Sequence, residues 1–173
     1  MRAEQAEQKD TTGVMQLVTL CIQHMRASGI YQWDEVYPDL QVVEEDAYTR
    51  SLFVIRQDGL CVASVSLNDV QPDEYRSVKW WYVSGQALVV HRLCVHPDWQ
   101  RRGLGKNMMD FAESFAINHD FSCIRLDAYT GNPQALALYE RRGYQRVGQV
   151  YFPRRELPFD CFEKVLSKRE QTD

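Results

Sequence analysis

An apolar strand that runs into a turn rich in glycines and cations is the feature that most constrains the fold of this chain. The run "ALVVHRLCV" at 87–95 is typical of a strand buried on both faces in the middle of a sheet. "QRRGLGK" follows at 100–106. Apolar residues then recur at helical spacing: Leu104, Met108, Phe111 and Phe115. This order predicts a buried strand, a tight turn and a helix that packs on the sheet.

The turn itself predicts a phosphate site. A helix N-terminus leaves backbone N–H groups without acceptors and carries a partial positive charge, so it attracts anions. Gly103 and Gly105 let the backbone approach a ligand closely, because glycine has no Cβ. Arg101, Arg102 and Lys106 add positive charge. The alternative is a plain strand-to-helix turn whose arginines face solvent.

Two familiar phosphate motifs do not match this turn. A P-loop requires a glycine where Gln100 stands, and a serine or threonine where Asn107 stands. A dinucleotide fingerprint requires a third glycine where Met108 stands. A nucleotide-binding protein is therefore disfavoured.

The rest of the chain mixes helical and strand patterns. They predict a short strand at the start, a helix from about Asp10 to Gly29, a short helix at 40–50, a hairpin at 52–67 around Asp58-Gly59, a strand at 121–129, a helix between Asn132 and Gly143, and strands at 145–152 and 159–166. Residues 68–86 lack a clean period, which predicts a long loop, although "RSVKWW" could form an edge strand. Hairpins at each end and a central strand–helix–strand crossover predict an α/β or α+β layered fold.

Length, charge and cysteine usage limit the class of protein. A chain of 173 residues predicts one domain over 1–173. The net charge of −4 argues against a general nucleic-acid binder, and no apolar run approaches the length of a membrane span. The charged start "MRAEQAEQKD" does not resemble a signal peptide. Five scattered cysteines without a CxxC pair predict no zinc site and a reducing, cytoplasmic location.

Two ordered motifs carry a resemblance to a known family. The strand "HRLCVHPDW" followed by "QRRGLGK" resembles the acetyl-coenzyme-A motif of the Gcn5-related N-acetyltransferases, a Q/R-x-x-G-x-G/A turn after an apolar strand. "NPQALALYERRGY" resembles the family's N-x-x-A-x-x-x-Y-x-x-x-G-F/Y helix, with matches at Asn132, Ala135, Tyr139, Gly143 and Tyr144. The two motifs lie between about Leu88 and Tyr144, at the separation that the family shows.

The resemblance implies a fold and a cofactor. The fold is a mixed, mostly antiparallel sheet of six or seven strands flanked by helices, whose central parallel strands, 87–95 and 122–129, splay into a V. The cofactor is acetyl-CoA. The resemblance implies that the pantetheine arm binds the backbone of Leu93, Cys94 and Val95. It places the pyrophosphate on the turn formed by Gln100, Arg101, Arg102, Gly103, Leu104, Gly105 and Lys106. The sulfur end is bordered by Asn132, Ala135 and Tyr139.

The implied reaction transfers an acetyl group from the thioester to a primary amine, by direct attack within a ternary complex. Tyr139 matches the motif tyrosine and is the candidate acid for the departing thiolate; the alternative is that it packs helix against sheet. His91 is the candidate base, because some members of the family that acetylate arylalkylamines place a histidine there. Its alternative is a buried histidine bonded to the sheet. Strand alternation puts Cys94 on the opposite face, which disfavours a covalent acyl intermediate.

The acceptor site implied by the family includes the segment "YQWDEVYP" between the first two helices. Trp33 could stack on a substrate, and Asp34 or Glu35 could hold a cation; the alternative is that Trp33 plugs the loop into the core and the acids face solvent. The 68–86 loop is a second lining candidate. A small amine, an amino acid, a polyamine, an antibiotic and a protein N-terminus all stay open as acceptors.

The sequence therefore predicts an acetyl-CoA-dependent N-acetyltransferase with no metal, nucleic-acid or membrane partner. A homodimer is compatible with the family. The rival function is a non-catalytic acyl-CoA-binding sensor, which would keep the phosphate turn but need no catalytic groups. The presence of both His91 and Tyr139 favours the enzyme.

Overall fold

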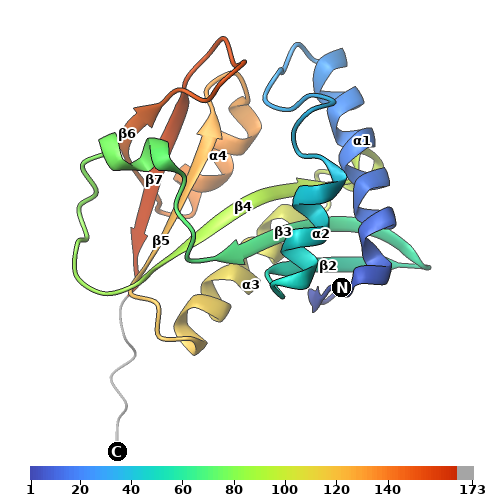
Figure 1. The fold of residues 1–173 in the computed structure, drawn as a ribbon, viewed down its shortest axis with the longest axis horizontal. Helices are drawn as coiled ribbons and strands as arrows, with labels where there is room; N and C mark the ends of the chain where they lie inside the picture. The colour runs from blue at the N-terminus through green and yellow to red at the C-terminus, as the bar shows by residue number, and fades with distance from the viewer. Residues whose placement is uncertain (167–173) are drawn as a thin grey trace, which may run out of the picture. The chain divides into compact units, whose positions relative to one another are not determined.

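The computed structural model describes residues 1–166, which form a seven-stranded sheet with four α-helices (Figure 1). The elements are β1 (Glu4–Gln5), η1 (Gln8–Asp10), α1 (Thr11–Ala27), α2 (Leu40–Tyr48), β2 (Leu52–Gln57), β3 (Leu60–Asn68), η2 (Asp73–Ser77), β4 (Ala87–Val95), η3 (Pro97–Trp99), α3 (Leu104–Asn118), β5 (Cys123–Tyr129), α4 (Pro133–Arg141), β6 (Gln145–Val150) and β7 (Phe159–Val165). The strand order is β1-β2-β3-β4-β5-β7-β6, with β4 and β5 parallel. The predicted mixed, mostly antiparallel α/β fold is confirmed.

The described chain divides into two compact units. One comprises Met1–Asn68 and Val90–Phe111, and the other comprises 69–89 and 112–166. Both β4 and α3 begin in one unit and end in the other. The predicted V between β4 and β5 stays a prediction.

In the first unit, helices cover both faces of the β2–β3 hairpin. Leu52 and Val54 of β2 belong to a buried cluster with the apolar stripe of α1 and with α2. The side chain between them, Phe53, faces the other way, and its ring centroid lies 4.9 Å from that of Phe111 in α3. The hairpin turn has left-handed backbone at Asp58 (φ 51°) and Gly59 (φ 79°), as the predicted two-residue turn requires.

In the second unit, β5 is the central strand. It pairs in parallel with β4 through Ala87–Val89 and antiparallel with β7, which in turn pairs with β6. The α4 helix begins at Pro133, where the side chain of Asn132 accepts a hydrogen bond from the Ala135 N–H at 3.2 Å. Gly143, in left-handed backbone (φ 79°), follows the end of α4. The predicted proline–glycine helix is therefore confirmed.

The 69–86 segment is irregular but firmly attached to β5 and β7. It contains the short helix η2, and "RSVKWW" forms no strand in the described structure. Glu163 is buried and its carboxylate accepts N–H bonds from Trp81 (2.9 Å) and Tyr82 (3.1 Å). The same carboxylate forms an ion pair, at 3.1 Å, with buried Arg125. The guanidinium of Arg125 lies 4.4 Å from the Trp80 ring centroid. A buried charge network therefore fixes this loop.

This network predicts a large stability loss when one charge is removed. In Glu163→Gln, Arg125 keeps a buried charge without its anionic partner, so the free energy of unfolding should fall by about 3–5 kcal/mol. Urea unfolding followed by circular dichroism measures this. Asp73→Asn is the matched control, because Asp73 pairs with Arg76 on the surface and its loss should cost less than about 1 kcal/mol. Equal losses in the two variants would show that the Glu163 pair does not hold the loop.

Candidate active site

The turn between β4 and α3 has the backbone that a phosphate cradle needs. Arg101 (φ 59°) and Gly103 (φ 83°) both lie in the left-handed region. No atom outside the neighbouring residues lies within 4 Å of the point where a Gly103 Cβ would stand, so the backbone is open to a ligand there. Asn107 donates its N–H to Gly103 at 2.9 Å, which leaves the earlier N–H groups of α3 pointing out of the helix end. The turn can therefore bind an anion through its main chain.

The cations of this turn differ in how far they can contribute charge. The Arg102 guanidinium stacks 5.0 Å from the Trp99 ring centroid. Lys106 pairs with Asp110 at 2.7 Å, so its charge is partly compensated. Arg101 and Arg102 are exposed. Most of the anion attraction should therefore come from the two arginines and the N–H groups.

The end of β4 is held by bonds to the protein itself. The Val95 carbonyl accepts a hydrogen bond from Gln100 Nε2 at 3.2 Å and another from the Cys21 thiol at 3.4 Å. The Cys94 thiol lies 3.2 Å from the Ser64 hydroxyl in the buried cluster of the first unit. The roles of Leu93, Cys94 and Val95 in coenzyme binding stay predictions.

The backbone of β4 departs from regular strand geometry at Arg92, where φ is 52°. Simple alternation therefore does not hold across this residue, and the expected placement of His91 and Cys94 on opposite faces cannot be derived from it. His91 is half-buried, and its Nε2 lies 3.0 Å from Asn68 Oδ1. The structure thus shows the hydrogen bond to the sheet, and the role of His91 as a base stays a prediction.

Tyr139 is almost fully buried, with 7% of its surface exposed. Its ring packs on Phe162 and Tyr144, with centroids 5.9 and 6.0 Å away. Burial, together with the charge of Asp127, raises the pKa of Tyr139 above its usual value. Tyr139 therefore packs as the alternative proposed, and it also remains protonated at neutral pH, as an acid must.

Asp127 is a candidate site residue that sequence reasoning missed. It is half-buried on β5, and it accepts a hydrogen bond from the hydroxyl of buried Tyr75 at 2.8 Å. Its charge acts on Tyr139, as the raised pKa of that tyrosine shows. The available signal was an aspartate in the otherwise apolar second half of "CIRLDAY". A carboxylate near the motif tyrosine can accept a proton or hold an ammonium group.

In the loop between α1 and α2, the residues predicted to bind the acceptor make contacts with other residues of the protein. Trp33 is buried in the cluster with α1 and α2, as the alternative proposed. Asp34 Oδ1 accepts the N–H groups of Val36 and Tyr37, each at 2.9 Å. Glu35 forms a two-pronged ion pair with Arg26, which lowers the pKa of Glu35. The role of Trp33, Asp34 and Glu35 in acceptor binding stays a prediction, and the two acids no longer argue for a cationic acceptor.

A groove of about 540 Å³ lies on the first unit, between α1 and the start of β3. Its walls include Met15, Leu20, Leu60, Cys61 and His96. It includes none of the residues predicted to bind the coenzyme or the acceptor. It is therefore a separate surface feature.

Comparison with known proteins decides the family. The model of the acetyltransferase (GNAT) family matches residues 19–144. The chain belongs to this family. The prediction that it is an enzyme of the acyltransferase class is thereby confirmed. In the described residues, no helix is both long enough and apolar enough to cross a membrane.

Two curated relatives of the GNAT chain come from Bacillus subtilis (strain 168). The S-(2-succino)cysteine N-acetyltransferase is 23% identical, over 83% of this chain and 84% of that protein. The S-alkylcysteine N-acetyltransferase is 23% identical, over 83% and 76%.

Solved structures share the GNAT fold. An acetyltransferase of Streptococcus agalactiae has a TM-score of 0.83 at 20% identity and covers 96% of each chain. The yncA protein of Salmonella typhimurium, solved with its cofactor acetyl-CoA, has a TM-score of 0.72 at 16% identity, over 100% of this chain and 98% of that chain. At these identities the likeness shows the fold alone.

The buried tyrosines of this GNAT chain predict a loss of stability in alkali. Burial raises the pKa of Tyr139, and it does the same for Tyr75 and Tyr144. A group whose pKa is higher in the folded than in the unfolded chain stabilises the fold below the unfolded value, here about 10, and this contribution is lost as the pH rises. The free energy of unfolding should therefore fall above about pH 10.

Tyrosinate absorbance and circular dichroism, recorded together against pH, measure this effect. Tyr75, Tyr139 and Tyr144 should ionise only as the chain unfolds. Ionisation of all nine tyrosines while the circular dichroism stays native would contradict the expectation.

Proposed function

We propose that this chain is an N-acetyltransferase that uses acetyl-CoA, with residues 1–173 as one catalytic domain. The observation that carries the proposal is the turn before α3. Its left-handed Gly103 leaves open space, and its helix end presents N–H groups. The related fold solved with acetyl-CoA supports the choice of cofactor. The amine would attack the acetyl group directly, within a ternary complex.

The turn would hold the coenzyme through its main chain. The N–H groups of Arg101 to Lys106 would bind the pyrophosphate, and the charges of Arg101 and Arg102 would add attraction. Asn132, Ala135 and Tyr139 would border the sulfur end, as the family motif implies. Bound acetyl-CoA supplies the thioester, whose carbonyl carbon the amine attacks.

The amine must lose a proton, because an alkylammonium group is mostly protonated at neutral pH. His91 is the first candidate base. Its Nε2 lies 3.0 Å from Asn68 Oδ1, and a neutral imidazole has one nitrogen that can take a proton, directly or through water. Asp127 is the second candidate, supported by its carboxylate near Tyr139. The hydroxyl of Tyr139 would then give a proton to the departing thiolate.

We propose an amino acid with a free α-amine as the first acceptor class to test. Support comes from two relatives named for S-substituted cysteines. A polyamine loses support, because Arg26 neutralises Glu35 and loop N–H groups occupy Asp34. The decisive screen measures thiol release and product mass with acetyl-CoA and S-methyl-L-cysteine, spermidine or a peptide with a free N-terminus. N-acetyl-S-methyl-L-cysteine is the control, since its amine is blocked.

The screen separates the enzyme from its rival. Thiol release with an acetylated product supports the transferase, and the preferred amine defines the acceptor class. Tight binding of acetyl-CoA with no turnover of any amine would favour the acyl-CoA sensor instead.

The five cysteines support a reducing compartment such as the cytoplasm, because all are free and buried. A homodimer stays an expectation that size-exclusion chromatography with light scattering can test.

Replacement of Gly103 tests the coenzyme cradle. Acetyl-CoA at a hundred times its dissociation constant should stabilise the chain by about 2.7 kcal/mol, whereas NAD and ATP should do so much less. Gly103→Glu should abolish this thermal shift, because the side chain occupies the open space and its charge repels phosphate.

Gly59→Glu is the matched control for the cradle. Gly59 has nearly the same backbone, φ 79° against 83°, and an equally open Cβ position, but it lies in the β2–β3 hairpin. Both variants should lose similar intrinsic stability, and only Gly103→Glu should lose the shift. Equal stabilisation by ATP would contradict acetyl-CoA as the ligand.

Separate substitutions test the two proton transfers. His91→Gln should lower kcat by about 10²–10⁴ and remove the acidic limb of the pH–rate profile. Tyr139→Phe should lower kcat and keep acetyl-CoA affinity, since only a hydroxyl is lost. The Tyr139 effect should shrink with an acyl donor whose thiol is more acidic, because that thiolate needs less protonation; the His91 effect should not.

Two further variants complete this test. Asp127→Asn should remove the acidic limb instead if Asp127 is the base. Tyr144→Phe loses a buried hydroxyl next to Tyr139 and should show no dependence on the leaving thiol. An unaltered kcat in Tyr139→Phe, measured where chemistry limits the rate, would leave Tyr139 as a packing residue.

A further inference from the structure

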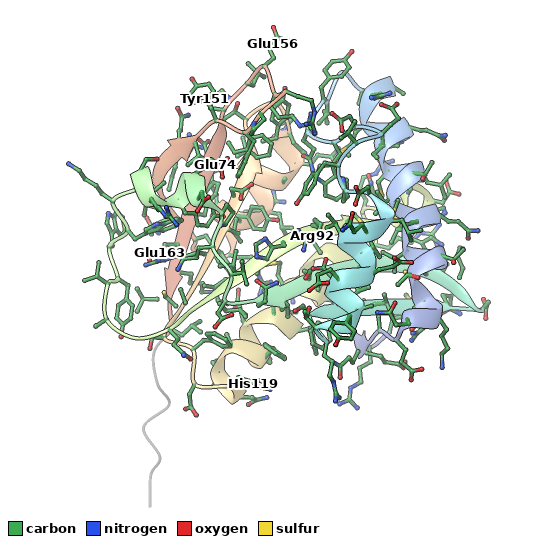
Figure 2. The ribbon with its side chains drawn as sticks, viewed as in Figure 1. Glu74, Arg92, His119, Tyr151, Glu156 and Glu163 are labelled. Atoms are coloured by element: carbon green, nitrogen blue, oxygen red, sulfur yellow. The ribbon has the colours of Figure 1, made fainter. Side chains whose placement is uncertain are left out.

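The guanidinium of Arg92 makes polar contacts with two side chains from other elements, Asp46 and Tyr37. Its side chain is 15% exposed, and it forms a two-pronged ion pair with Asp46, Nε to Oδ2 at 2.9 Å and Nη2 to Oδ1 at 2.6 Å. Its Nη1 donates to the Tyr37 hydroxyl at 3.0 Å. Figure 2 labels Arg92 on β4. One guanidinium therefore binds two side chains that lie far from it in the sequence.

Both partners belong to the segment predicted to border the acceptor. Tyr37 lies in the loop between α1 and α2, residues 28–39, which we call the acceptor loop. Asp46 lies in α2, directly after that loop, and its side chain is 8% exposed. The acceptor loop is also anchored by Trp33, which is buried in the apolar cluster that includes Cys94 of β4, and it is braced internally by Asp34. Arg92 adds a directional polar link between this loop and β4, through its hydrogen bond to Tyr37.

Arg92 makes these contacts from an unfavourable backbone conformation. Its φ of 52° is rarely adopted by residues other than glycine, asparagine or aspartate. A glycine would fit the backbone at less cost but would lose the guanidinium. A buried ion pair is also a weak source of stability compared with apolar packing. An arginine at this position is therefore unfavourable in two ways, through its backbone conformation and through the burial of its charge. Such a residue is a candidate for a functional role.

We propose that Arg92 is a positioning residue, which holds the acceptor loop against β4 so that the loop is in place when the amine binds. The residue before Arg92 is His91, the candidate base. The irregular backbone of β4 at Arg92 would therefore fix the positions of both the base and the loop. This inference rests on the proposed function. It assigns Arg92, Asp46 and Tyr37 to acceptor binding and not to coenzyme binding.

The mildest test is Tyr37→Phe, which removes one hydroxyl and leaves the ring. The loss of one hydrogen bond predicts about a 3- to 10-fold rise in the KM for S-methyl-L-cysteine, with kcat and the acetyl-CoA Kd unchanged. Tyr48→Phe is the matched control, since Tyr48 is a 78% exposed tyrosine on α2. Asp46→Asn should raise the same KM further, against Glu45→Gln on the same helix as its control.

Two variants of Arg92 distinguish positioning from simple stability. Arg92→Lys keeps the charge but cannot make the fork, so it should raise the acceptor KM, and Tyr37→Phe should add little to it in the double variant. Arg92→Gly relieves the backbone and should still raise the KM. If only the backbone mattered, Arg92→Gly would match the unmodified protein.

Hydrogen exchange tests the tie without any acceptor. In Tyr37→Phe and Arg92→Lys, amides of residues 31–39 should exchange several-fold faster, while those of β3 do not change. Unchanged exchange in both variants would overturn the proposal, as would an equal rise in acetyl-CoA Kd and acceptor KM. If the unmodified protein turns over no amine, the proposed function fails, and the exchange result alone still decides whether Arg92 holds the loop.

Discussion

The unpaired N–H groups at the start of α3 are the constraint on which the candidate site depends. Every α-helix begins with such groups. Here they follow a buried strand directly, because β4 ends and α3 begins within a short, sharply turning segment. That segment needs left-handed backbone at Arg101 and Gly103 and a fixed strand end. Gln100 and Cys21 supply the second requirement, because both donate to the Val95 carbonyl. The turn is therefore held from the strand side, while its N–H groups face outward.

In each unit, an arginine on a strand of the sheet makes several polar contacts with an irregular loop or its neighbouring helix. In the first unit, Arg92 of β4 binds Asp46 in α2 and Tyr37 in the acceptor loop. In the second unit, Arg125 of β5 binds Glu163 and the 69–86 loop. A planar guanidinium suits this task, since its several donors point in fixed directions and can bind a carboxylate and a backbone or hydroxyl oxygen together. Loops that lack periodic structure thus gain defined positions.

Features that depend on local sequence could be predicted, and features that depend on distant partners could not. The turn at Asp58-Gly59 and the helix between Pro133 and Gly143 follow from backbone preferences of single residues, and the structure has both. The strand β4 and the helix α3 could likewise be predicted, from the spacing of their apolar residues. The left-handed backbone of Arg92 gave no signal, because arginine is not a residue that favours it.

Charged residues were the hardest to interpret for the same reason. Asp34 and Glu35 looked available for a cation, since sequence shows an acid but not its partner. Arg26 and the loop N–H groups occupy them. Asp127 was overlooked because its contact with Tyr75 and its charge effect on Tyr139 arise only when the chain is folded. The chemistry of a site residue is set by partners that only the fold brings together.

These internal pairings limit what net charge can say about the acceptor. The chain carries a formal charge of −4, which by itself would favour a cationic amine. Three acids in or beside the acceptor loop are already engaged: Asp34 with N–H groups, Glu35 with Arg26 and Asp46 with Arg92. An acid whose field is cancelled by an adjacent cation attracts a distant ammonium group only weakly, because the two fields oppose each other and salt screens the remainder. Under the proposed function, the acceptor would therefore be selected by short-range contacts, for which the position of the loop matters more than the charge it carries.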